Sequence, residues 1–524
     1  MTRAPESSTG HRWDDECDVL VVGSGGGALT GAYTAAREGL SVILVEASDR
    51  FGGTTAYSGG GMWFPCNAAL RRAGSEDTLE DARTYFRSVV GDSAPVELQD
   101  AFLDNGAPLV DYLESDDDFE FMAYPWPDYY GSAPKASAGD RHIMMQPLQP
   151  EQLGSLRDSL RPTLPVERAG QPLPELVIGG QALVGRLLLA LSRREQADLR
   201  LNTVGDELVR DGDTVVGAVV TQDGVRRRIR ARRGVLVAAG GFEQNQAMRT
   251  EYGVPGVARD AMGPESNQGL AIQAGMQVGG DVALMSEAWW SPGLTHPDGS
   301  STFSLLFTGG IFVDDSGERF VNESTAYDRI GREVLARIAD GSLTLPFWMV
   351  YDDRDGERPP VRTASIPIGE TKDYQAAGLW VSADTLDELA AKIDVPADRL
   401  AATVARFNGF VEADDDADFR RGADPYDRAF AGGGSPLIAI EKGPFHAAAF
   451  GVSDLGTKGG LRTDASARVL DRDGAVIKGL YAAGNSMAAA SGTAYPGGGN
   501  PVGAAMVFGH LAALDMAASD PAAS

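Results

Sequence analysis

Residues 482–503, near the C-terminal end of the sequence, combine features suited to contact with a flat molecule. The segment reads AAGNSMAAASGTAYPGGGNPVG and holds a single tyrosine, three consecutive glycines and an Asn-Pro pair. Glycines have no Cβ, so their backbone can approach a planar ring closely. Asn500 can cap a helix whose first residue is Pro501, with Val502 next, and the positive end of that helix would face the bound group. The segment therefore predicts a cofactor contact.

A strand that runs into a glycine turn near the N-terminus provides a second candidate site. Residues 17–22 are mostly apolar and β-branched, and we expect a helix over residues 29–38. Gly23 permits a tight turn, Gly25 lets backbone N–H groups approach a pyrophosphate, and Ala28 is small enough for close helix–strand packing. This order of elements predicts a dinucleotide-binding unit.

The residues that follow this unit distinguish between NAD and FAD as the bound dinucleotide. A second strand, residues 41–46, ends in Glu46, whose carboxylate can accept both hydroxyls of a ribose. A second run of glycines and hydroxyl side chains follows, which a nicotinamide domain does not need. An extended FAD needs it, because the pyrophosphate and the flavin require further backbone donors. We predict that this second contact is made by Gly53, Thr54, Thr55, Ser58 and Gly60.

Two later segments are expected to complete the same sheet. Residues 206–221 predict a β-hairpin, and residues 230–242 predict a strand that ends at a glycine pair. Residues 476–485 predict a C-terminal strand that returns to the sheet. The cofactor-binding residues predicted in addition to those above are Gly26, Val204, Ala239, Gly240, Gly484, Asn485, Pro501 and Val502.

Composition limits which kind of protein can carry these motifs. The 524 residues suffice for two or three domains, and 43% of them are hydrophobic. Lys and Arg number 46 against 74 Asp and Glu, and this net charge of −28 argues against nucleic acid and anionic membranes as partners. Two cysteines and five scattered histidines give no metal-ligand spacing, so no metal site is expected. Because no signal-peptide pattern and no long apolar stretch occurs, we expect no transmembrane segment and a cytoplasmic protein.

These motifs together resemble those of the fumarate reductase / succinate dehydrogenase flavoprotein superfamily, and within it the 3-ketosteroid Δ1-dehydrogenases. The segments that carry the resemblance are residues 17–63, 235–242, 319–327, 406–408 and 481–503. The resemblance implies an α/β fold in which a Rossmann-like FAD-binding domain is split by an inserted α+β catalytic domain. We expect the FAD domain at residues 1–287 and 451–524, the catalytic domain at residues 288–450, and the active site between them.

The resemblance also implies which residues act on the substrate. The Tyr495 hydroxyl and the Gly499 N–H would form an oxyanion hole for the 3-carbonyl of a ketosteroid. Tyr327 would remove the proton from carbon 2 with help from Tyr129, while a hydride leaves carbon 1 for FAD; the neighbouring Tyr130 competes with Tyr129 for its role. A phenol with a pKa near 10 needs a stabilising neighbour or a proton relay to act as a base. The implied partners are a 3-ketosteroid and an external, quinone-like electron acceptor.

Three alternative functions use the same FAD-binding body. A 3-ketosteroid Δ4-(5α)-dehydrogenase would introduce the double bond at carbons 4 and 5. A fumarate-reductase-like enzyme would need several Arg and His side chains around a dicarboxylate, and the inserted region does contain arginines. A non-enzymatic electron carrier would have no use for an oxyanion hole. The tyrosines and the glycine run favour dehydrogenation of a ketosteroid at carbons 1 and 2.

Overall fold

One sheet joins the two ends of the chain, which confirms the predicted return of the C-terminal strand. The computed structural model describes residues 12–431 and 434–519, so the first eleven residues of the polar N-terminus lie outside it. In the described part, an eight-stranded sheet has the order β19-β20-β8-β9-β1-β2-β6, with β7 paired to β8. Strands β6, β2, β1, β9 and β20 are parallel to one another. The bounds are β1 Asp15–Val22, β2 Val42–Val45, β6 Ala197–Arg200, β7 Thr203–Asp211, β8 Thr214–Gln222, β9 Val225–Val237, β19 Arg468–Leu470 and β20 Val476–Ala482.

The hairpin predicted at residues 206–221 is present as the antiparallel pair β7–β8. The following strand, β9, carries several arginines; Arg230 and Arg232 pair with acidic side chains of the neighbouring β1, and Arg226 pairs with Glu207 of β7. Arg232, for example, contacts Glu16 at 2.6 Å and Asp18 at 2.9 Å. These ion pairs account for the basic strand without a phosphate site.

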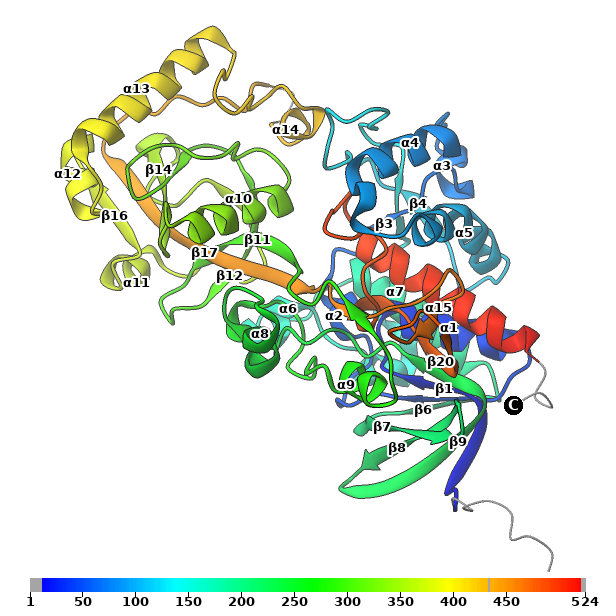
Figure 1. The fold of residues 1–524 in the computed structure, drawn as a ribbon. Helices are drawn as coiled ribbons and strands as arrows, with labels where there is room; N and C mark the ends of the chain where they lie inside the picture. The colour runs from blue at the N-terminus through cyan, green and yellow to red at the C-terminus, as the bar shows by residue number, and fades with distance from the viewer. Residues whose placement is uncertain (1–11, 432–433, 520–524) are drawn as a thin grey trace, which may run out of the picture.

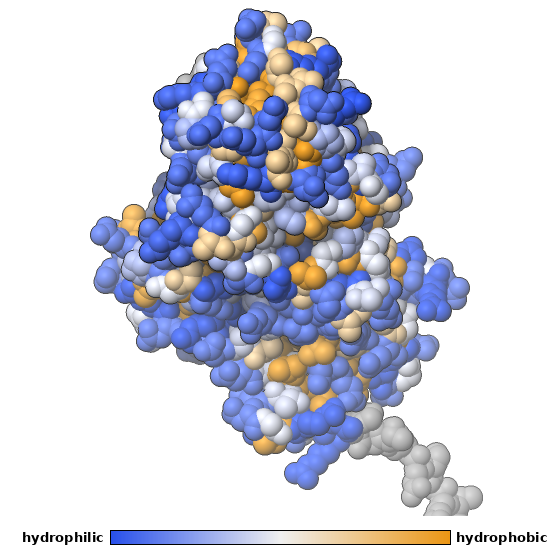
Figure 2. Space-filling view, turned by 90° about the vertical axis from the view of Figure 1, so that its left-hand side faces the viewer, coloured by the Kyte–Doolittle hydropathy of each residue, from blue (hydrophilic) through white to orange (hydrophobic). Residues whose placement is uncertain are grey.

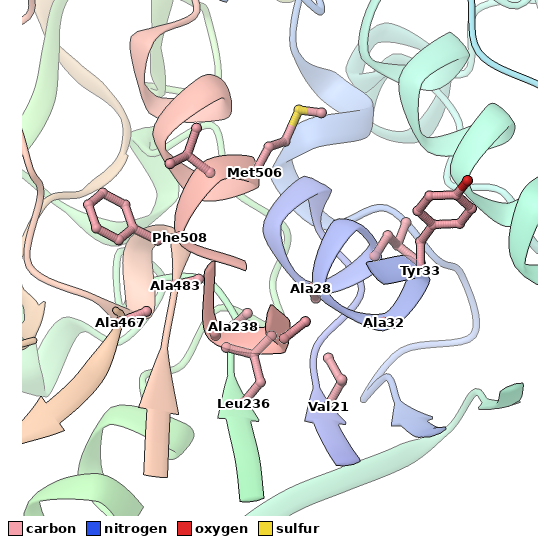
Figure 3. Close-up of a cluster of buried hydrophobic side chains, with 14 of the residues drawn as sticks. Val21, Ala28, Ala32, Tyr33, Leu236, Ala238, Ala467, Ala483, Met506 and Phe508 are labelled. Atoms are coloured by element: carbon pink, nitrogen blue, oxygen red, sulfur yellow. The ribbon is translucent and has the colours of Figure 1, made fainter. Parts of the chain in front are cut away.

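Three helices cover this sheet, and two of them meet backbone to backbone. Helices α1 (Gly26–Arg37), α7 (Gly179–Ser192) and α15 (Asn500–Ala518) pack together, α1 against both others, and Figure 1 shows α15 lying along α1. A Cβ on Gly27 would lie 2.6 Å from the Ala505 carbonyl oxygen, and a Cβ on Gly509 would lie 2.1 Å from that of Gly27. Only glycines allow this approach. Figure 3 shows buried side chains around this contact, with the small Ala28 and Ala32 beside larger ones such as Tyr33 and Phe508, and Ala28 is fully buried.

Two predicted helix starts are wrong in detail. Helix α1 begins at Gly26 rather than residue 29, with Gly25 as its N-cap. Helix α15 begins at Asn500, and its N-cap is Gly499 rather than Asn500. The reason is backbone conformation: Gly499 has φ +81, the left-handed region that glycine enters at little cost, so the chain turns into the helix one residue earlier. The amide group of Asn500 is buried and has no partner among the described residues.

A second, antiparallel sheet lies on the other side of the molecule, at the upper left in Figure 1. Among the described residues it has seven strands in the order β13-β14-β17-β11-β12-β15, with β16 paired to β17. The long strand β17 passes through residue 450, where the sequence analysis placed a domain limit; the predicted limits themselves stay predictions. The bounds are β11 Ala288–Thr295, β12 Ser301–Phe307, β13 Ile311–Val313, β14 Phe347–Asp352, β15 Val361–Ala364, β16 Trp380–Ala383, β17 Phe445–Thr457, α10 Tyr327–Asp340, α11 Thr371–Ala376, α12 Leu386–Lys392, α13 Ala397–Ala413 and α14 Pro425–Ala429.

A cluster of buried charges fastens the loop before α10 to the segment after α13. Arg319 contacts Glu323 and Asp416, each at 2.8 Å, and Arg421 contacts Glu323 at 3.1 Å. Removing one member of such a cluster leaves an uncompensated buried charge, which costs about 3–5 kcal/mol. The cluster therefore holds in place the loop that leads to Tyr327, the first residue of α10.

The remaining elements form a smaller region above the first sheet and the connections around it. A three-stranded sheet, β3-β5-β4, is covered by α3, α4 and α5. The bounds are β3 Met62–Trp63, β4 Phe121–Ala123, β5 His142–Met145, β10 Val282–Ala283, β18 Gly460–Leu461, α2 Gly53–Tyr57, α3 Ala68–Arg72, α4 Leu79–Val90, α5 Val96–Glu114, α6 Leu164–Ala169, α8 Gln246–Tyr252, α9 Leu270–Gln277, η1 Gly91–Ser93, η2 Pro150–Ser159, η3 Ala258–Asp260, η4 Asp353–Asp355 and η5 Gly484–Ser486.

Helix α15 is the one helix among the described residues that is long and apolar enough to cross a membrane. Its packing against α1 and its start beside glycine-rich loops identify it as a core helix instead. On the face shown in Figure 2, hydrophilic residues cover most of the surface and hydrophobic residues lie in small separate groups.

Candidate active site

A cavity of about 540 Å³ runs from the glycine turn after β1 to an aromatic cluster beside the second sheet. Every residue predicted to bind the cofactor or act on the substrate lines this cavity, except Ala28, which is buried between α1 and the sheet. The residues come from segments more than 400 positions apart in the sequence. The fold therefore brings the predicted sites together in one place.

At one end, the cavity is lined by backbone suited to an anionic group. Helix α1 begins there, and its N-cap Gly25 provides no side-chain hydrogen bond to the first turn, which also contains no acidic residue. Gly23 has φ +106, and a Cβ on it would lie 2.4 Å from the Ala238 carbonyl oxygen, so only glycine fits between β1 and β9. A helix N-terminus at a glycine turn, with no acidic residue in its first turn, is a favourable site for a pyrophosphate.

Glu46 closes the same end of the cavity. Its carboxylate is buried at the end of β2 and accepts hydrogen bonds from the Ser24 hydroxyl at 2.6 Å and from the Ser48 hydroxyl at 2.8 Å. A carboxylate already oriented by hydroxyl donors on both oxygens is in place to accept ribose hydroxyls as well. The donor set thus fits the adenosine end of a dinucleotide.

The backbone of the second run of glycines packs closely against the start of α7. A Cβ on Gly60, which has φ +71, would lie 2.2 Å from the carbonyl carbon of Gly179. The Thr55 hydroxyl accepts a hydrogen bond from the Gly26 N–H at 2.9 Å, which ties this run to the first glycine turn. The two predicted phosphate contacts therefore form one continuous wall.

Three tyrosines meet at the other end of the cavity. Tyr129 comes from the segment between β4 and β5, Tyr327 is the first residue of α10, and Tyr495 precedes α15. Their ring centroids are 5.4 Å apart for Tyr129–Tyr327, 5.0 Å for Tyr129–Tyr495 and 5.7 Å for Tyr327–Tyr495. All three rings are buried and pack against one another in edge-on or tilted contacts.

Burial sets the electrostatics of this cluster. It raises the pKa of Tyr327 and of Tyr129 well above 10, since a phenolate there would lose its hydration and face the other phenols. It raises the pKa of Tyr495 to about 12, and the nearby Tyr327 hydroxyl and Gly499 N–H oppose that rise. At neutral pH all three side chains are neutral hydrogen-bond donors.

Gly499 can present its N–H beside Tyr495 because of its unusual backbone. A Cβ there would lie 1.9 Å from the carbonyl oxygen of Gly61 on the opposite wall. The positive φ and this close approach both require glycine. Tyr495 and Gly499 both line this end of the cavity, as the predicted pair of donors requires.

Between the two adjacent candidates, Tyr129 lines the cavity and Tyr130 does not. The Tyr130 ring lies under the guanidinium group of Arg329, 5.3 Å away. The Tyr129 N–H donates to the Pro496 carbonyl at 3.0 Å, which ties its segment to the glycine run. The preceding residue, Asp128, is buried and accepts hydrogen bonds from the Trp63 indole at 2.8 Å and from Arg141 at 2.7 Å.

Several cavity residues were absent from the prediction. Trp289 lines the cavity and packs edge-on against Tyr495 at 4.8 Å, whereas the adjacent Trp290 lies in the core of the second sheet. Asn267 donates to the Thr54 hydroxyl at 3.1 Å and to buried Glu243 at 2.6 Å. Strand alternation could have indicated that one tryptophan of the pair faces the cavity, but no local pattern identifies Asn267.

Comparisons with known proteins agree with this geometry. Residues 18–502 match the family model described as an FAD binding domain. The 3-oxosteroid 1-dehydrogenase of Rhodococcus opacus is 38% identical, over 96% of this chain and 99% of that protein. The 4-oxocyclohexanecarboxylate 2-dehydrogenase of Sinomonas cyclohexanicum is 35% identical, over 95% of this chain and 92% of that protein.

Among solved structures, the chain is similar to the 3-ketosteroid delta1-dehydrogenase from Sterolibacterium denitrificans in complex with 1,4-androstadiene-3,17-dione. The TM-score is 0.88 with 31% identity, over 97% of this chain and 100% of that one. The matched family confirms FAD as the cofactor, and the relatives confirm an FAD-dependent oxidoreductase. The chain therefore belongs to the 3-ketosteroid Δ1-dehydrogenase family, within the fumarate reductase / succinate dehydrogenase flavoprotein superfamily.

Proposed function

We propose that this enzyme introduces the carbon 1–carbon 2 double bond into 3-ketosteroids. The observation that carries the proposal is the meeting of Tyr129, Tyr327, Tyr495 and Gly499 at the end of the FAD cavity. The relatives named as 3-oxosteroid 1-dehydrogenases support the same substrate class. An external, quinone-like acceptor would then reoxidise the cofactor.

The cofactor would lie along the glycine-rich walls. Gly25 and Gly26 would face the pyrophosphate, Glu46 the adenosine ribose, and the run from Gly53 to Gly60 the flavin end. When bound, FAD supplies a hydride acceptor at N5. The N-terminal end of α15 at the cavity places partial positive charge where negative charge develops on reduction.

The reaction removes a proton from carbon 2 and a hydride from carbon 1, and the double bond forms between them. As the proton leaves, negative charge develops on the 3-carbonyl oxygen. The Tyr495 hydroxyl and the Gly499 N–H would donate hydrogen bonds to that oxygen, and each such donor is worth about 2.7–4 kcal/mol in a buried site.

Tyr327 would take the proton from carbon 2. Its raised pKa makes an isolated Tyr327 a poor base, so its own hydroxyl proton must move to a neighbour as the new proton arrives. Tyr129, whose ring packs against that of Tyr327, would accept this proton and release its own hydroxyl proton onward towards solvent. This arrangement supports a shared role for the two tyrosines.

The charges around the cavity favour a neutral substrate. In the described part of the chain, no Arg or Lys side chain lines the cavity. The alternative of a dicarboxylate substrate depended on arginines of the inserted region. These arginines lie in ion pairs with carboxylates; they are Arg319, Arg329, Arg332 and Arg337. A fumarate-like dicarboxylate, or a ring carrying a carboxylate, would therefore enter without a cationic partner, which is costly. A fused-ring ketone fits the apolar lining of Trp126, Trp289, Phe303 and Leu305.

Reduction of the bound FAD by substrate in the absence of oxygen tests the proposal. We expect androst-4-ene-3,17-dione to bleach the flavin absorbance, and fumarate and 4-oxocyclohexanecarboxylate to leave it unchanged. Mass spectrometry of the product from 5α-androstane-3,17-dione, which is saturated at both positions, deuterated at carbons 1 and 4, then separates the two positions: loss of label from carbon 1 supports the proposal. Loss from carbon 4 alone would show a Δ4-(5α)-dehydrogenase, and no bleaching by the steroid would refute the function.

A further inference from the structure

We propose that Lys458 is a positioning residue that holds Tyr495 in place for the reaction. This inference rests on the proposed role of Tyr495 in binding the substrate carbonyl. Lys458 directly follows β17, the strand that passes from the second sheet towards the first (Figure 1). Its side chain is fully buried and does not line the cavity.

The ammonium group touches the chain just before Tyr495. Its Nζ donates to the carbonyl oxygens of Thr493 at 2.8 Å and of Ala494 at 3.1 Å. These are the two residues that precede Tyr495 in the sequence. Lys458 therefore fixes the backbone from which the Tyr495 ring projects.

The same ammonium group also holds the ring that packs on Tyr495. Nζ lies 4.2 Å from the ring centroid of Trp289, within the range of a cation–π contact. Trp289 packs edge-on against Tyr495 with centroids 4.8 Å apart, and its indole N–H donates to Asn485 at 3.3 Å. One buried amine thus acts on Tyr495 from the backbone side and from the ring side.

Burying the Lys458 ammonium group in these surroundings is energetically unfavourable, which argues that the residue has a function. No carboxylate oxygen of a described residue lies within 4.0 Å of Nζ, so the charge has no ion-pair partner there. Burial lowers the pKa of Lys458 to about 7; Asp328 and Glu287 oppose that shift and Arg332 adds to it. Buried amines of this kind cluster at functional sites. Because a neutral amine still has two N–H donors, both carbonyl contacts can persist in either protonation state.

Other groups hold this loop only in part. Arg332 also donates to the Thr493 carbonyl, and the Ser491 hydroxyl donates to that of Ala494 at 3.1 Å. Neither touches the Trp289 ring. Loss of Lys458 would therefore leave the loop attached but free the Tyr495 ring to shift, and a misplacement of about 1 Å can cost on the order of 100-fold in rate.

A double-mutant cycle tests whether Lys458 acts through Tyr495. The four proteins are wild type, Lys458→Met, Tyr495→Phe and the double variant, all assayed as FAD-loaded enzyme for kcat and KM with androst-4-ene-3,17-dione. We expect Lys458→Met to lower kcat/KM at least tenfold when Tyr495 is present and less than threefold when Phe replaces it. The exposed Lys478→Met on β20 is the control and should match wild type. Neighbouring residues that act as a unit show this non-additivity.

Binding gives a second readout that does not depend on turnover. We expect Lys458→Met to weaken the affinity for androsta-1,4-diene-3,17-dione, followed by the flavin absorbance shift, about tenfold, and to do so only with Tyr495 present. Equal losses in both backgrounds, or full activity of Lys458→Met, would overturn the inference. If Lys458→Met does not retain FAD, the shorter Lys458→Gln replaces it in the same cycle with the same criteria. A wild-type enzyme that does not oxidise the steroid would refute the proposed function instead.

Discussion

Replacing Gly499 by alanine tests the geometry of the oxyanion hole with the smallest possible change. The substitution adds one methyl group and leaves the N–H and every other side chain in place. If Gly499 were only a flexible linker, the enzyme would tolerate it. If its N–H must point at the substrate carbonyl from a left-handed backbone, the activity must fall.

Two costs follow from the structure. An alanine at φ +81 carries about 1–2 kcal/mol of backbone strain. Its Cβ would lie 1.9 Å from the Gly61 carbonyl oxygen, so the two walls must separate by about 1.5 Å to reach ordinary van der Waals contact. A donor moved by about 1 Å loses most of its transition-state contact, and the expected loss in rate is on the order of 100-fold.

Steady-state turnover of androst-4-ene-3,17-dione, with flavin content measured from absorbance, gives the result. The matched control is Gly341→Ala at the end of α10, where φ is +80 and a Cβ meets nothing within 4 Å. Gly341→Ala introduces similar backbone strain but no steric clash, so it should lower the free energy of unfolding by about 1–2 kcal/mol and keep its activity. A Gly499→Ala enzyme that retains FAD and turns over within threefold of wild type would refute the placement of this N–H.

Three further predictions concern the tyrosines, a buried ion cluster and pH. Tyr327→Phe and Tyr495→Phe should each keep FAD and lose about 100-fold or more in kcat. The control is Tyr426→Phe, which removes a buried hydroxyl from the same aromatic cluster but outside the FAD cavity and should keep activity. Equal losses of kcat in all three variants would contradict the assignment. Arg319→Met leaves Asp416 without its ion-pair partner and Glu323 with Arg421 alone, and it should lower the free energy of unfolding in urea by about 3 kcal/mol. A loss below about 1 kcal/mol would show that the cluster is not stabilising. Burial lowers the pKa of His510 from 6.5 to about 4, so the unfolded chain binds a proton in that window that the folded chain does not, and stability falls as the pH falls. Denaturant unfolding of His510→Gln should reduce that slope by about 1.4 kcal/mol per pH unit, and an unchanged slope would contradict the buried neutral state.

The cofactor half of the cavity was predictable because its signals are local. The glycine turn at Gly23 and Gly25, the acid at Glu46 and the second glycine run each follow from a few consecutive residues whose backbone must meet an anion or a flat ring. The start of α15 was nevertheless predicted one residue too late. A side-chain cap at Asn500 and a left-handed Gly499 both start a helix at nearly the same position, and the local sequence does not distinguish them.

The substrate end was not predictable from local pattern. The tyrosines at 129, 327 and 495 entered through family resemblance, since nothing in their neighbouring sequence shows that three distant segments converge. Lys458 was missed for the same reason, and Trp289 could not be assigned to the site, because an apolar pocket and an ordinary interface core use similar residues. The fold places both next to Tyr495 or to the chain that carries it.

The burial of the tyrosines explains why phenols serve at this end of the cavity. A carboxylate or an ammonium group in such an apolar site would pay a large desolvation cost or change its protonation state. Phenols with raised pKa values stay neutral and remain donors, which suits Tyr495 but opposes a base at Tyr327. The proposed relay between the packed tyrosines would resolve this conflict, because a proton would enter Tyr327 from carbon 2 as another leaves towards Tyr129 and onward. In the proposed mechanism the acid–base group would be the set of packed tyrosines, and its titration would belong to the set rather than to any one residue.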